Sequence, residues 1–316
     1  MLRKIILPAV FIMCITLSLI GCSVTQQADT GTDKPDQNQT GDQGTITQDE
    51  QKALLSEFNA LVEENSDIEA IIEYVDSNIA KLSLENASEM IAGLEKAHNG
   101  YLPQFASRFY SDPTIPQKFL DEYKPGMDIN DVDAVNDEEL KQLLIQTKAA
   151  GYKVDTAEGM FYPIIDYQRY LDYSSQVTPD IKAYIDIMAV ESNEPSARDA
   201  ALVIAWDEVL TRALNQEKFI NTYADSAKLA DVQKLYERYV QFVLFGTNNT
   251  PLFTYDEKSL SSEAKTSYEK ILAESEPSQL AGLVQGLLDT VEQSNGRLTT
   301  EVEEYRKNCL QDLGIN

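Results

Sequence analysis

The chain has 316 residues, with 52 acidic and 26 basic side chains and a formal net charge of −26. Such a charge repels nucleic acid and anionic surfaces, so we expect no nucleic-acid partner. The single histidine excludes zinc sites that need two and leaves one candidate base for Ser-His-Asp or Cys-His catalysis. The sequence contains no G-x-G and no Gly-Lys pair, which excludes the dinucleotide fingerprint and the phosphate-binding loop. We therefore expect no cofactor.

An apolar leader opens the chain. Arg3 and Lys4 give it a positive start, Ile5–Ile20 is almost wholly apolar, and a small residue precedes Cys22, which is the pattern of a signal peptide. Its last four residues, Leu-Ile-Gly-Cys, resemble the lipobox of bacterial lipoproteins. The resemblance implies that residues 1–21 are removed and that Cys22 is acylated. The alternative is an uncleaved membrane anchor with an incidental Cys22, although the run is at the short limit for a span.

Both interpretations place the rest of the chain outside the cytoplasm. Two or more acyl chains at Cys22 bind a membrane stably without help from protein charge. We therefore expect the protein on the extracytoplasmic face of the cell membrane, with an envelope protein or polymer as its partner. Cys14 leaves with the leader, so Cys309 is the one remaining thiol and no disulfide forms within the chain. Val302 and Tyr305 precede it at helical spacing, which predicts a small core residue and not a nucleophile.

Amino-acid composition and the spacing of apolar residues divide the remainder of the chain into segments. Residues 22–48 are rich in Thr, Gln, Asp and Gly with few apolar side chains, which predicts a disordered tether. A helical period begins at residue 49 and changes near Gly151. We therefore expect an N-terminal helical subdomain over 49–150 and a C-terminal one over 151–316, with one continuous domain as the alternative.

Three amphipathic helices are predicted at the start of the first subdomain. Start signals at Thr47, Ser66 and Ser83 each precede apolar residues at helical spacing, and Gly100 is expected to stop the third helix. Their short connections indicate an antiparallel bundle. His98 lies just before the expected stop, so its partial positive charge would suit a helix C-terminus.

An acidic loop and a hairpin interrupt this pattern. The oxygens of residues 128–133 suit calcium, but Val132 falls where an EF-hand needs an oxygen ligand. A solvated linker with helix-capping side chains is the alternative, and we assign no metal site. The next helix is expected to end at Gly151. Apolar residues on both sides of Glu158-Gly159 then predict a small β-hairpin near 152–162.

Tyrosines and acids crowd the segment after the hairpin. Tyr162 and Tyr167, with Asp166 between them, are candidates to line a groove for a sugar or a peptide. The alternative is that each ring packs in the core while its hydroxyl reaches water.

The longest helix is expected at Ser196–Tyr223, because the apolar run at its centre suits a helix surrounded by others. Asp199, Asp207 and Glu208 flank that run. With Asp166 they are the candidate catalytic carboxylates of a glycoside hydrolase, which needs only an acid and a base or nucleophile. The alternative is that these acids mark where the helix meets solvent.

Residues 219–236 resemble the helix-turn-helix junction of tetratricopeptide-like repeats, through Phe219, Tyr223, Leu235 and Tyr236. The resemblance implies paired antiparallel helices. It does not extend to a solenoid, because the pattern fails to recur at the period of about 34 residues that such repeats have.

The loop after Gly246 is dense in side-chain amides and hydroxyls. Thr247, Asn248 and Asn249 are candidate ligand-binding residues, because such turns can hold a polar ligand or the backbone of a neighbouring loop. Ordinary turn chemistry is the alternative.

The C-terminal part predicts three more helices, over 262–274, 277–293 and 298–313. Gly282 and Gly286 lie one turn apart, and each glycine weakens a helix by about 1 kcal/mol relative to alanine. A close helix crossing at these glycines would account for them.

The fold expected from these patterns is all-α: a multi-helix antiparallel array or bundle with a small hairpin. No catalytic signature stands out. The expected function is therefore that of a membrane-tethered binding or interaction module for an envelope partner or ligand, with a carbohydrate-active hydrolase as the alternative.

Overall fold

The part of the chain that the structure describes is helical. The structure is a computed structural model and describes residues 46–64, 67–124 and 126–315, which belong to one compact unit. The expected signal peptide, Cys22 and most of the tether lie outside the described residues. None of the helices in these ranges is both long and apolar enough to cross a membrane.

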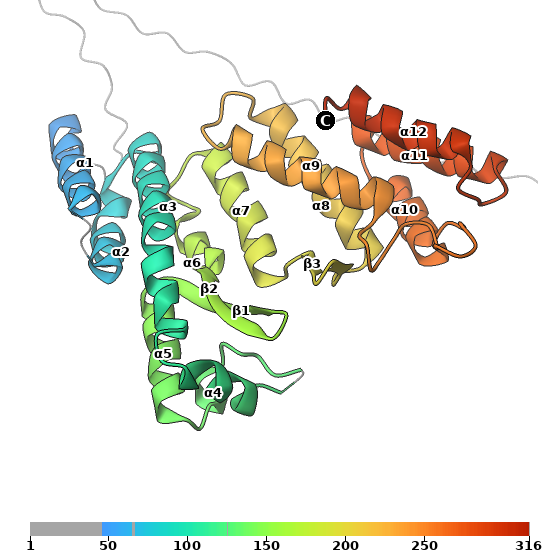
Figure 1. Cartoon of the computed structure of the whole chain (residues 1–316). Helices are drawn as coiled ribbons and strands as arrows, with labels where there is room; N and C mark the ends of the chain where they lie inside the picture. Colours follow the sequence, from blue (N-terminus) through green and yellow to red (C-terminus); the bar gives the residue numbers. More distant parts are fainter. Residues whose placement is uncertain (1–45, 65–66, 125, 316) are drawn as a thin grey trace, which may run out of the picture. The chain divides into compact units, whose positions relative to one another are not determined.

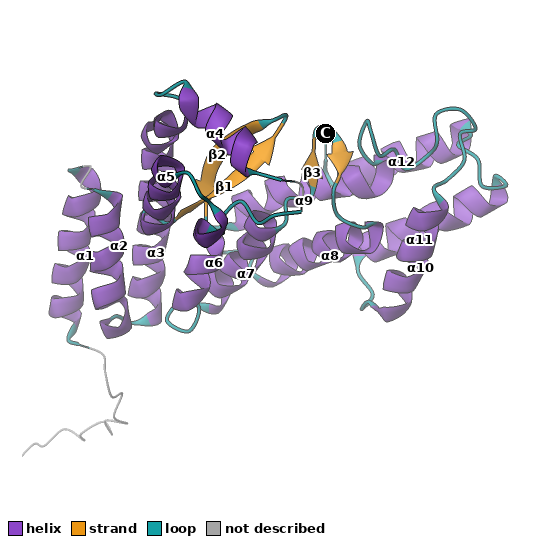
Figure 2. Cartoon of the chain, turned by 90° about the horizontal axis from the view of Figure 1, so that it is seen from below, coloured by secondary structure: helices purple, strands orange, loops and turns teal. Residues whose placement is uncertain are grey.

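Within these ranges there are twelve α-helices and two small antiparallel sheets. The helices are α1 Gln48–Glu63, α2 Ile68–Asn78, α3 Leu84–Ala106, α4 Thr114–Glu122, α5 Glu138–Ala149, α6 Tyr167–Tyr170, α7 Pro179–Asn193, α8 Trp206–Thr222, α9 Leu229–Phe245, α10 Ser262–Glu274, α11 Gln279–Gln293 and α12 Thr300–Asp312. The strands are β1 Tyr152–Ala157 with β2 Met160–Ile165, and β3 Ala197–Arg198 with β4 Ala201–Leu202. The predicted all-α fold with a small hairpin is confirmed (Figures 1 and 2).

Local signals account for many helix ends. Thr47 and Glu50 form the predicted capping box, in which each side chain accepts a hydrogen bond from the other residue's backbone amide. The Ser83 hydroxyl caps α3 as expected. Gly151 and Gly246 follow α5 and α9 with φ angles of 74°, in the left-handed region that ends a helix most easily at glycine.

The hairpin β1–β2 closes through a two-residue turn. Ala157 pairs with Met160, and Glu158 and Gly159 between them both take positive φ, as this type of turn requires. The hairpin also packs on helices, since the ring of Phe161 stacks on an aromatic ring of α4. That packing supplies the stability that two isolated strands lack.

The expected stop of α3 at Gly100 is wrong. The helix runs on to Ala106, because the residues beyond the glycine have a buried surface to contact. Phe105 is buried, and its ring centroid lies 5.0 Å from that of Tyr152 on the hairpin. Tertiary packing therefore outweighs the local stop signal.

The expected helix over Ser196–Tyr223 is wrong in its first third. Residues 197–202 form the hairpin β3–β4, and α8 begins only at Trp206. Asp199 and Ala200 take positive φ angles of 49° and 58° in the turn between the strands, which a right-handed helix excludes. The longest helix of the described part is α3 instead.

The predicted close crossing in the C-terminal helices is confirmed at Gly286. A Cβ atom there would lie 2.1 Å from the hydroxyl of Tyr305 on α12, which donates to the carbonyl of Leu283 at 3.1 Å. Gly282 has open space around it.

Buried hydrophobic side chains form two clusters, and α7 lies between them. The first cluster takes most of its side chains from α1–α7, and the second takes them from α8–α12 and the loops that join them. Ile187 and Met188 on α7 and Ile220 on α8 pack against both clusters. Polar groups along α7 are therefore placed to connect the two halves of the unit.

Candidate functional site

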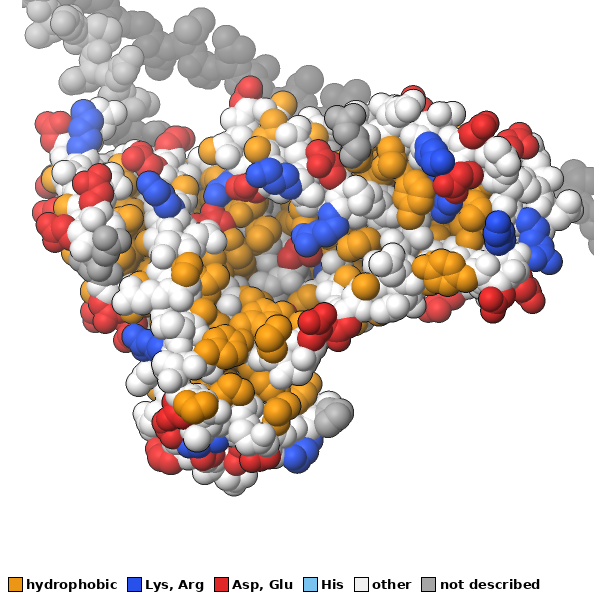
Figure 3. Space-filling model, in the orientation of Figure 1, with side chains coloured by type: hydrophobic (Ala, Val, Ile, Leu, Met, Phe, Trp, Pro, Cys, Tyr) orange, Lys and Arg blue, Asp and Glu red, His pale blue; other side chains and the backbone are white. Residues whose placement is uncertain are grey.

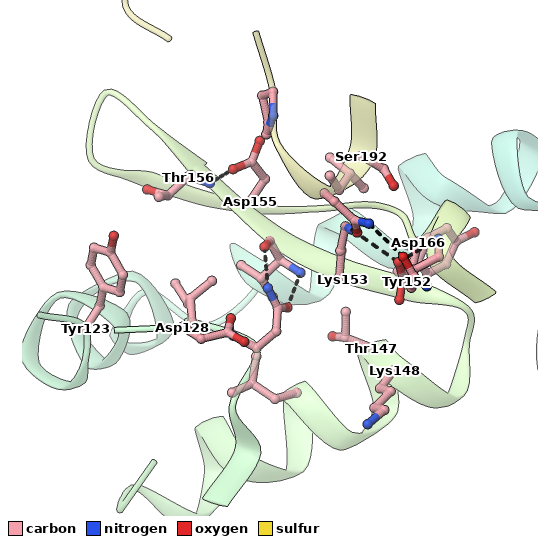
Figure 4. A pocket seen from close by; sticks show the side chains of 18 of the residues that line it. Tyr123, Asp128, Thr147, Lys148, Tyr152, Lys153, Asp155, Thr156, Asp166 and Ser192 are labelled. Atoms are coloured by element: carbon pink, nitrogen blue, oxygen red, sulfur yellow. Dashed lines mark hydrogen bonds and ion pairs between the residues drawn. The ribbon is translucent and has the colours of Figure 1, made fainter. Parts of the chain in front are cut away.

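A polar cavity of about 480 Å³ runs along β1 (Figure 4). We call it the β1 cavity. Its walls come from the loop before α5, from α5, from the hairpin, and from the segment at the end of α7. The lining residues are Tyr123, Met127, Asp128, Ile129, Asn130, Leu144, Thr147, Lys148, Tyr152, Lys153, Val154, Asp155, Thr156, Ile164, Asp166, Gln168, Ser192, Asn193, Pro195 and Arg198.

The outer edge of β1 is held by a side-chain amide. Asn130 donates to the carbonyl of Val154 at 3.0 Å and accepts from its amide at 2.7 Å, so it takes the place of a neighbouring strand. Tyr152 anchors the start of β1, since its hydroxyl donates to the carbonyl of His98 at 2.7 Å. The loop and the hairpin are thereby fixed relative to each other before any ligand binds.

Ion pairs and amides order the polar wall of the cavity. Lys153 contacts Asp166 at 3.2 Å and donates to the Asn193 side chain at 2.6 Å. Arg198 pairs with Asp155 at 2.5 Å. Figure 4 shows Lys153 and Asp166 together at one end, with Tyr123 and Asp128 toward the other. The lining contains three acids and three bases, so its formal charge is zero in a strongly acidic chain.

Two of the sequence candidates lie at or near this cavity. Asp166 lines it, while Tyr162 on β2 lies opposite Asp155 in the hairpin register. Burial raises the pKa of Tyr162, with a smaller contribution from Asp155. Asp199 lies at the turn of the β3–β4 hairpin, beyond Arg198.

The loop with Thr247, Asn248 and Asn249 holds a neighbouring backbone. Asn249 donates from its amide to the carbonyl of Ala200 and from its side chain to that of Asp199, both at 2.7 Å. The Thr247 hydroxyl accepts a hydrogen bond from within its own turn, and the Asn248 carbonyl accepts from a tyrosine hydroxyl. In the described structure, the loop therefore holds the β3–β4 turn through hydrogen bonds.

The other two candidate carboxylates lie on α8, away from the β1 cavity. Asp207 pairs with Lys270 on α10 at 3.3 Å. Glu208 pairs with Arg212 at 2.7 Å and lines a separate cavity of about 380 Å³ along α7 and α8. The four predicted acids are thus distributed over different surfaces.

Tyr167 belongs to a different cluster, which sequence reasoning missed. Its hydroxyl and that of Tyr184 donate to the buried carboxylate of Glu95, and Lys228 forms an ion pair with the same carboxylate. We call these four residues the Glu95 cluster. Burial and the carboxylate raise the pKa of both tyrosines, so both remain donors. The ring of Tyr167 packs in the core, as the alternative to a ligand groove has it, but its hydroxyl contacts Glu95 instead of reaching water.

The expected position of His98 at a helix end is also wrong. His98 lies inside α3 and is fully buried, and burial lowers its pKa to about 4. Its Nε2 lies 3.2 Å from the carbonyl of Ala150, which only accepts, so Nε2 carries the proton. Nδ1 then accepts from the Tyr170 hydroxyl at 2.7 Å. Both ring nitrogens form hydrogen bonds within the fold, so His98 is not available as a general base.

The acidic loop and Cys309 both make contacts within the fold. Asp128 and Asp131 each accept a backbone amide two residues further on, and the described residues contain no group of His, Cys, Asp and Glu arranged to hold a metal ion. Cys309 is buried as predicted, and burial raises the pKa of its thiol to about 11, which disfavours a nucleophilic thiolate.

Comparison with known proteins identifies no relative: no protein-family model matches the chain, and neither curated proteins nor solved structures give a significant match.

Proposed function

We propose that the chain is a lipid-anchored extracytoplasmic binding protein whose β1 cavity takes a neutral, hydroxyl-rich ligand of the carbohydrate class. The observation that carries this proposal is the balanced polar lining of the cavity. Three acids and three bases cancel, the side-chain amides of Gln168 and Asn193 add donors and acceptors, and the ring of Tyr123 adds apolar surface. Cavities with a few fixed polar groups and aromatic walls are the usual form of small-ligand sites.

Binding is favoured over hydrolysis by the placement of the carboxylates. Hydrolysis of a glycosidic bond needs two carboxyl groups facing each other across the substrate. Of the four acids considered, Asp166 lines the β1 cavity, Glu208 lines a different one, Asp207 is paired with Lys270 and Asp199 lies at the β3–β4 turn. The other two acids of the β1 cavity are engaged, since Asp155 pairs with Arg198 and Asp128 accepts the amide of Asn130.

The ligand proposal is tested by calorimetry with neutral oligosaccharides as probes: chitotetraose, cellotetraose and maltotetraose. We expect the full chain in detergent to bind at least one of them. Asn193→Ala should weaken that binding about fivefold, because a lost hydrogen bond to a ligand is worth about 1 kcal/mol. Asn308→Ala, an exposed amide on α12, is the matched control. Absence of heat with all three sugars, or equal affinities of the two variants, would refute the ligand class.

The anchor is tested separately, because it does not depend on the ligand. Mass spectrometry of the protein purified from native membranes should show acyl groups on Cys22 as the first residue. Cys22→Ala should move the protein to the soluble fraction. An unmodified Cys22 in membrane-derived material would contradict the lipoprotein assignment.

A further inference from the structure

A second, larger hollow lies on another surface of the unit, between α3, α7 and α9. We call it the α9 groove, and its volume is about 750 Å³. Its lining combines the Glu95 cluster with four further charged residues, Lys96, Asp231, Lys234 and Arg238. It shares no lining residue with the β1 cavity, so what it binds is independent of the carbohydrate proposal.

The charged groups at the floor of the groove are paired with one another, and their contacts hold the floor rigid. Glu95 is buried, and its carboxylate is held by the hydroxyls of Tyr167 and Tyr184 and by Lys228. The Lys228 ammonium also lies 4.8 Å from the ring centre of Tyr184. The one buried acid of the groove is thus neutralised by its own partners, and it does not oppose an incoming anion at full strength.

The rim of the groove carries cations that the protein leaves available. In the described part of the chain, Lys96, Lys234 and Arg238 form no ion pair. The groove holds four basic and two acidic side chains, whereas the whole chain has twice as many acids as bases. Charges are screened over about 8 Å at physiological ionic strength. A ligand in the groove therefore experiences this local excess of positive charge more strongly than the acidity of the whole chain.

The cations form a row. Lys234 and Arg238 are four residues apart on α9, one helical turn, and Lys228 lies at the start of the same helix. Lys228 shares its charge with Glu95 and Asp231, so the unpaired cations of the row are Lys234 and Arg238, about 6 Å apart along the helix. Lys96 faces it from α3. In Figure 3, Lys and Arg side chains gather over α9 along the edge of a hollow in the surface.

From this arrangement we infer that the α9 groove binds a linear polyanion of the phosphodiester class, with successive phosphates along the row on α9. A repeated charge suits a polymer better than an isolated anion, because each repeat meets another cation. Arg238 presents a planar fork that matches two phosphate oxygens, and the lysines act as point charges. Glu95 is a positioning residue, since it fixes Lys228 and does not meet the ligand.

The test measures binding of synthetic poly(glycerol phosphate) to the full chain in detergent micelles as a function of salt. Lys234→Gln/Arg238→Gln removes two cations from the groove. Lys52→Gln/Lys307→Gln removes two exposed cations from α1 and α12 and leaves the same net charge. We expect the groove variant to bind about tenfold more weakly and to lower the slope of log K against log salt by roughly 1–2 units. The control variant should match the wild type.

Four outcomes would overturn the inference. One is the absence of polymer binding by the wild type, and another is an equal loss in both variants. The third concerns the source of the phosphodiester. Vesicles of phosphatidylglycerol present the same group as a lipid surface, so binding of a Cys22→Ala chain to these vesicles without binding to the soluble polymer would assign the groove to a membrane surface. Equal binding of poly-glutamate would remove the preference for phosphate and would also overturn the stated class.

Discussion

Two ionic clusters lie along α7, and they bury opposite charges. In the Glu95 cluster, one carboxylate from α3 is held by two tyrosine hydroxyls and by Lys228. In the second, which we call the Arg212 cluster, one guanidinium from α8 contacts three carboxylates: Glu208 at 2.7 Å, Glu194 at 3.2 Å and Glu191 at 3.4 Å. The Tyr239 hydroxyl completes it, accepting from Arg212 and donating to Glu191 at 2.5 Å.

The clusters differ in what remains when the central group is lost. Without Glu95, the flexible Lys228 still has Asp231 at 3.7 Å and can turn toward water. Without Arg212, the carboxylate of Glu191 stays mostly buried on the rigid α7, with only a tyrosine hydroxyl as donor. Burial already raises the pKa of Glu191. The comparison indicates what sets the loss of folding free energy when a buried charge is removed. It is whether the former partner stays buried without a counter-charge, and not the number of bonds broken.

The largest effect is therefore expected at the Arg212 cluster. Arg212→Met should lower the free energy of unfolding by about 3–5 kcal/mol, because it strands the carboxylate of Glu191. Urea unfolding followed by circular dichroism measures this change. Arg108→Met, which removes an exposed guanidinium that lies over Phe105, is the control and should change stability by less than about 1 kcal/mol.

A second variant distinguishes the effect of leaving Glu191 without a counter-charge from the effect of lost packing around residue 212. Glu191→Leu/Arg212→Met removes both charges, and it should recover much of the stability that Arg212→Met loses. If the double variant is as unstable as the single one, lost packing accounts for the effect and the comparison fails.

The matching change at the first cluster is Glu95→Gln. It keeps an oxygen for the tyrosine hydroxyls and removes only the charge that Lys228 faces. We expect a loss of about 2 kcal/mol in the same unfolding experiment, smaller than for Arg212→Met, because Lys228 retains Asp231. A loss equal to or greater than that of Arg212→Met would contradict the explanation by stranded partners.

Local patterns predicted the elements well where the deciding residues are neighbours in sequence. The capping box at Thr47, the turn at Glu158-Gly159 and the stop at Gly246 each depend on residues within a few positions. The failure at Ser196–Tyr223 has the opposite cause. The turn at Asp199 and Ala200 is held by hydrogen bonds from Asn249, some fifty residues away. No local period contains that information.

The sites were predictable to a smaller degree for the same reason. Asp166 was a candidate because it stands among tyrosines, and it does line the β1 cavity. Glu95 carries no local signal, since an acid on an amphipathic helix normally faces water. Its partners Tyr184 and Lys228 lie 89 and 133 residues away. The only sequence signal for this cluster was a tyrosine-rich segment and a lysine without a predicted role. Neither identifies Glu95 as the carboxylate.

Lowering the pH should destabilise the half of the unit that contains His98 more than the other half. His98 lies one turn from Glu95 on α3, and its pKa of about 4 in the fold is below the value of about 6.5 in an unfolded chain. The unfolded state thus binds the extra proton first, and stability falls as the pH drops from about 6.5 to about 4. At pH 5 this effect amounts to about 2 kcal/mol relative to pH 7.

The measurement is the pH dependence of unfolding free energy in the wild type and in His98→Gln, which does not titrate at this position. The difference between their slopes isolates the histidine from the many surface acids. Hydrogen exchange at pH 5 should show faster opening around α3 and β1 than around α11 and α12. Parallel slopes in the two proteins would show that burial of His98 does not govern the acid response.

The smallest and most closely matched test removes one hydroxyl from each cluster. Tyr184→Phe leaves Glu95 with Tyr167 and Lys228, whereas Tyr239→Phe leaves Glu191 with Arg212 at 3.4 Å. Both changes delete one donor to a buried carboxylate and keep the ring in place, and Tyr239→Phe also removes an acceptor of Arg212. We expect losses of about 1 kcal/mol for Tyr184→Phe and about 2 kcal/mol for Tyr239→Phe, because Glu191 then keeps only the longer contact with Arg212. Differential scanning calorimetry of the two variants gives the order directly. The reverse order would mean that Arg212 satisfies Glu191 better than its distance implies, and that the clusters are more alike than their contacts indicate.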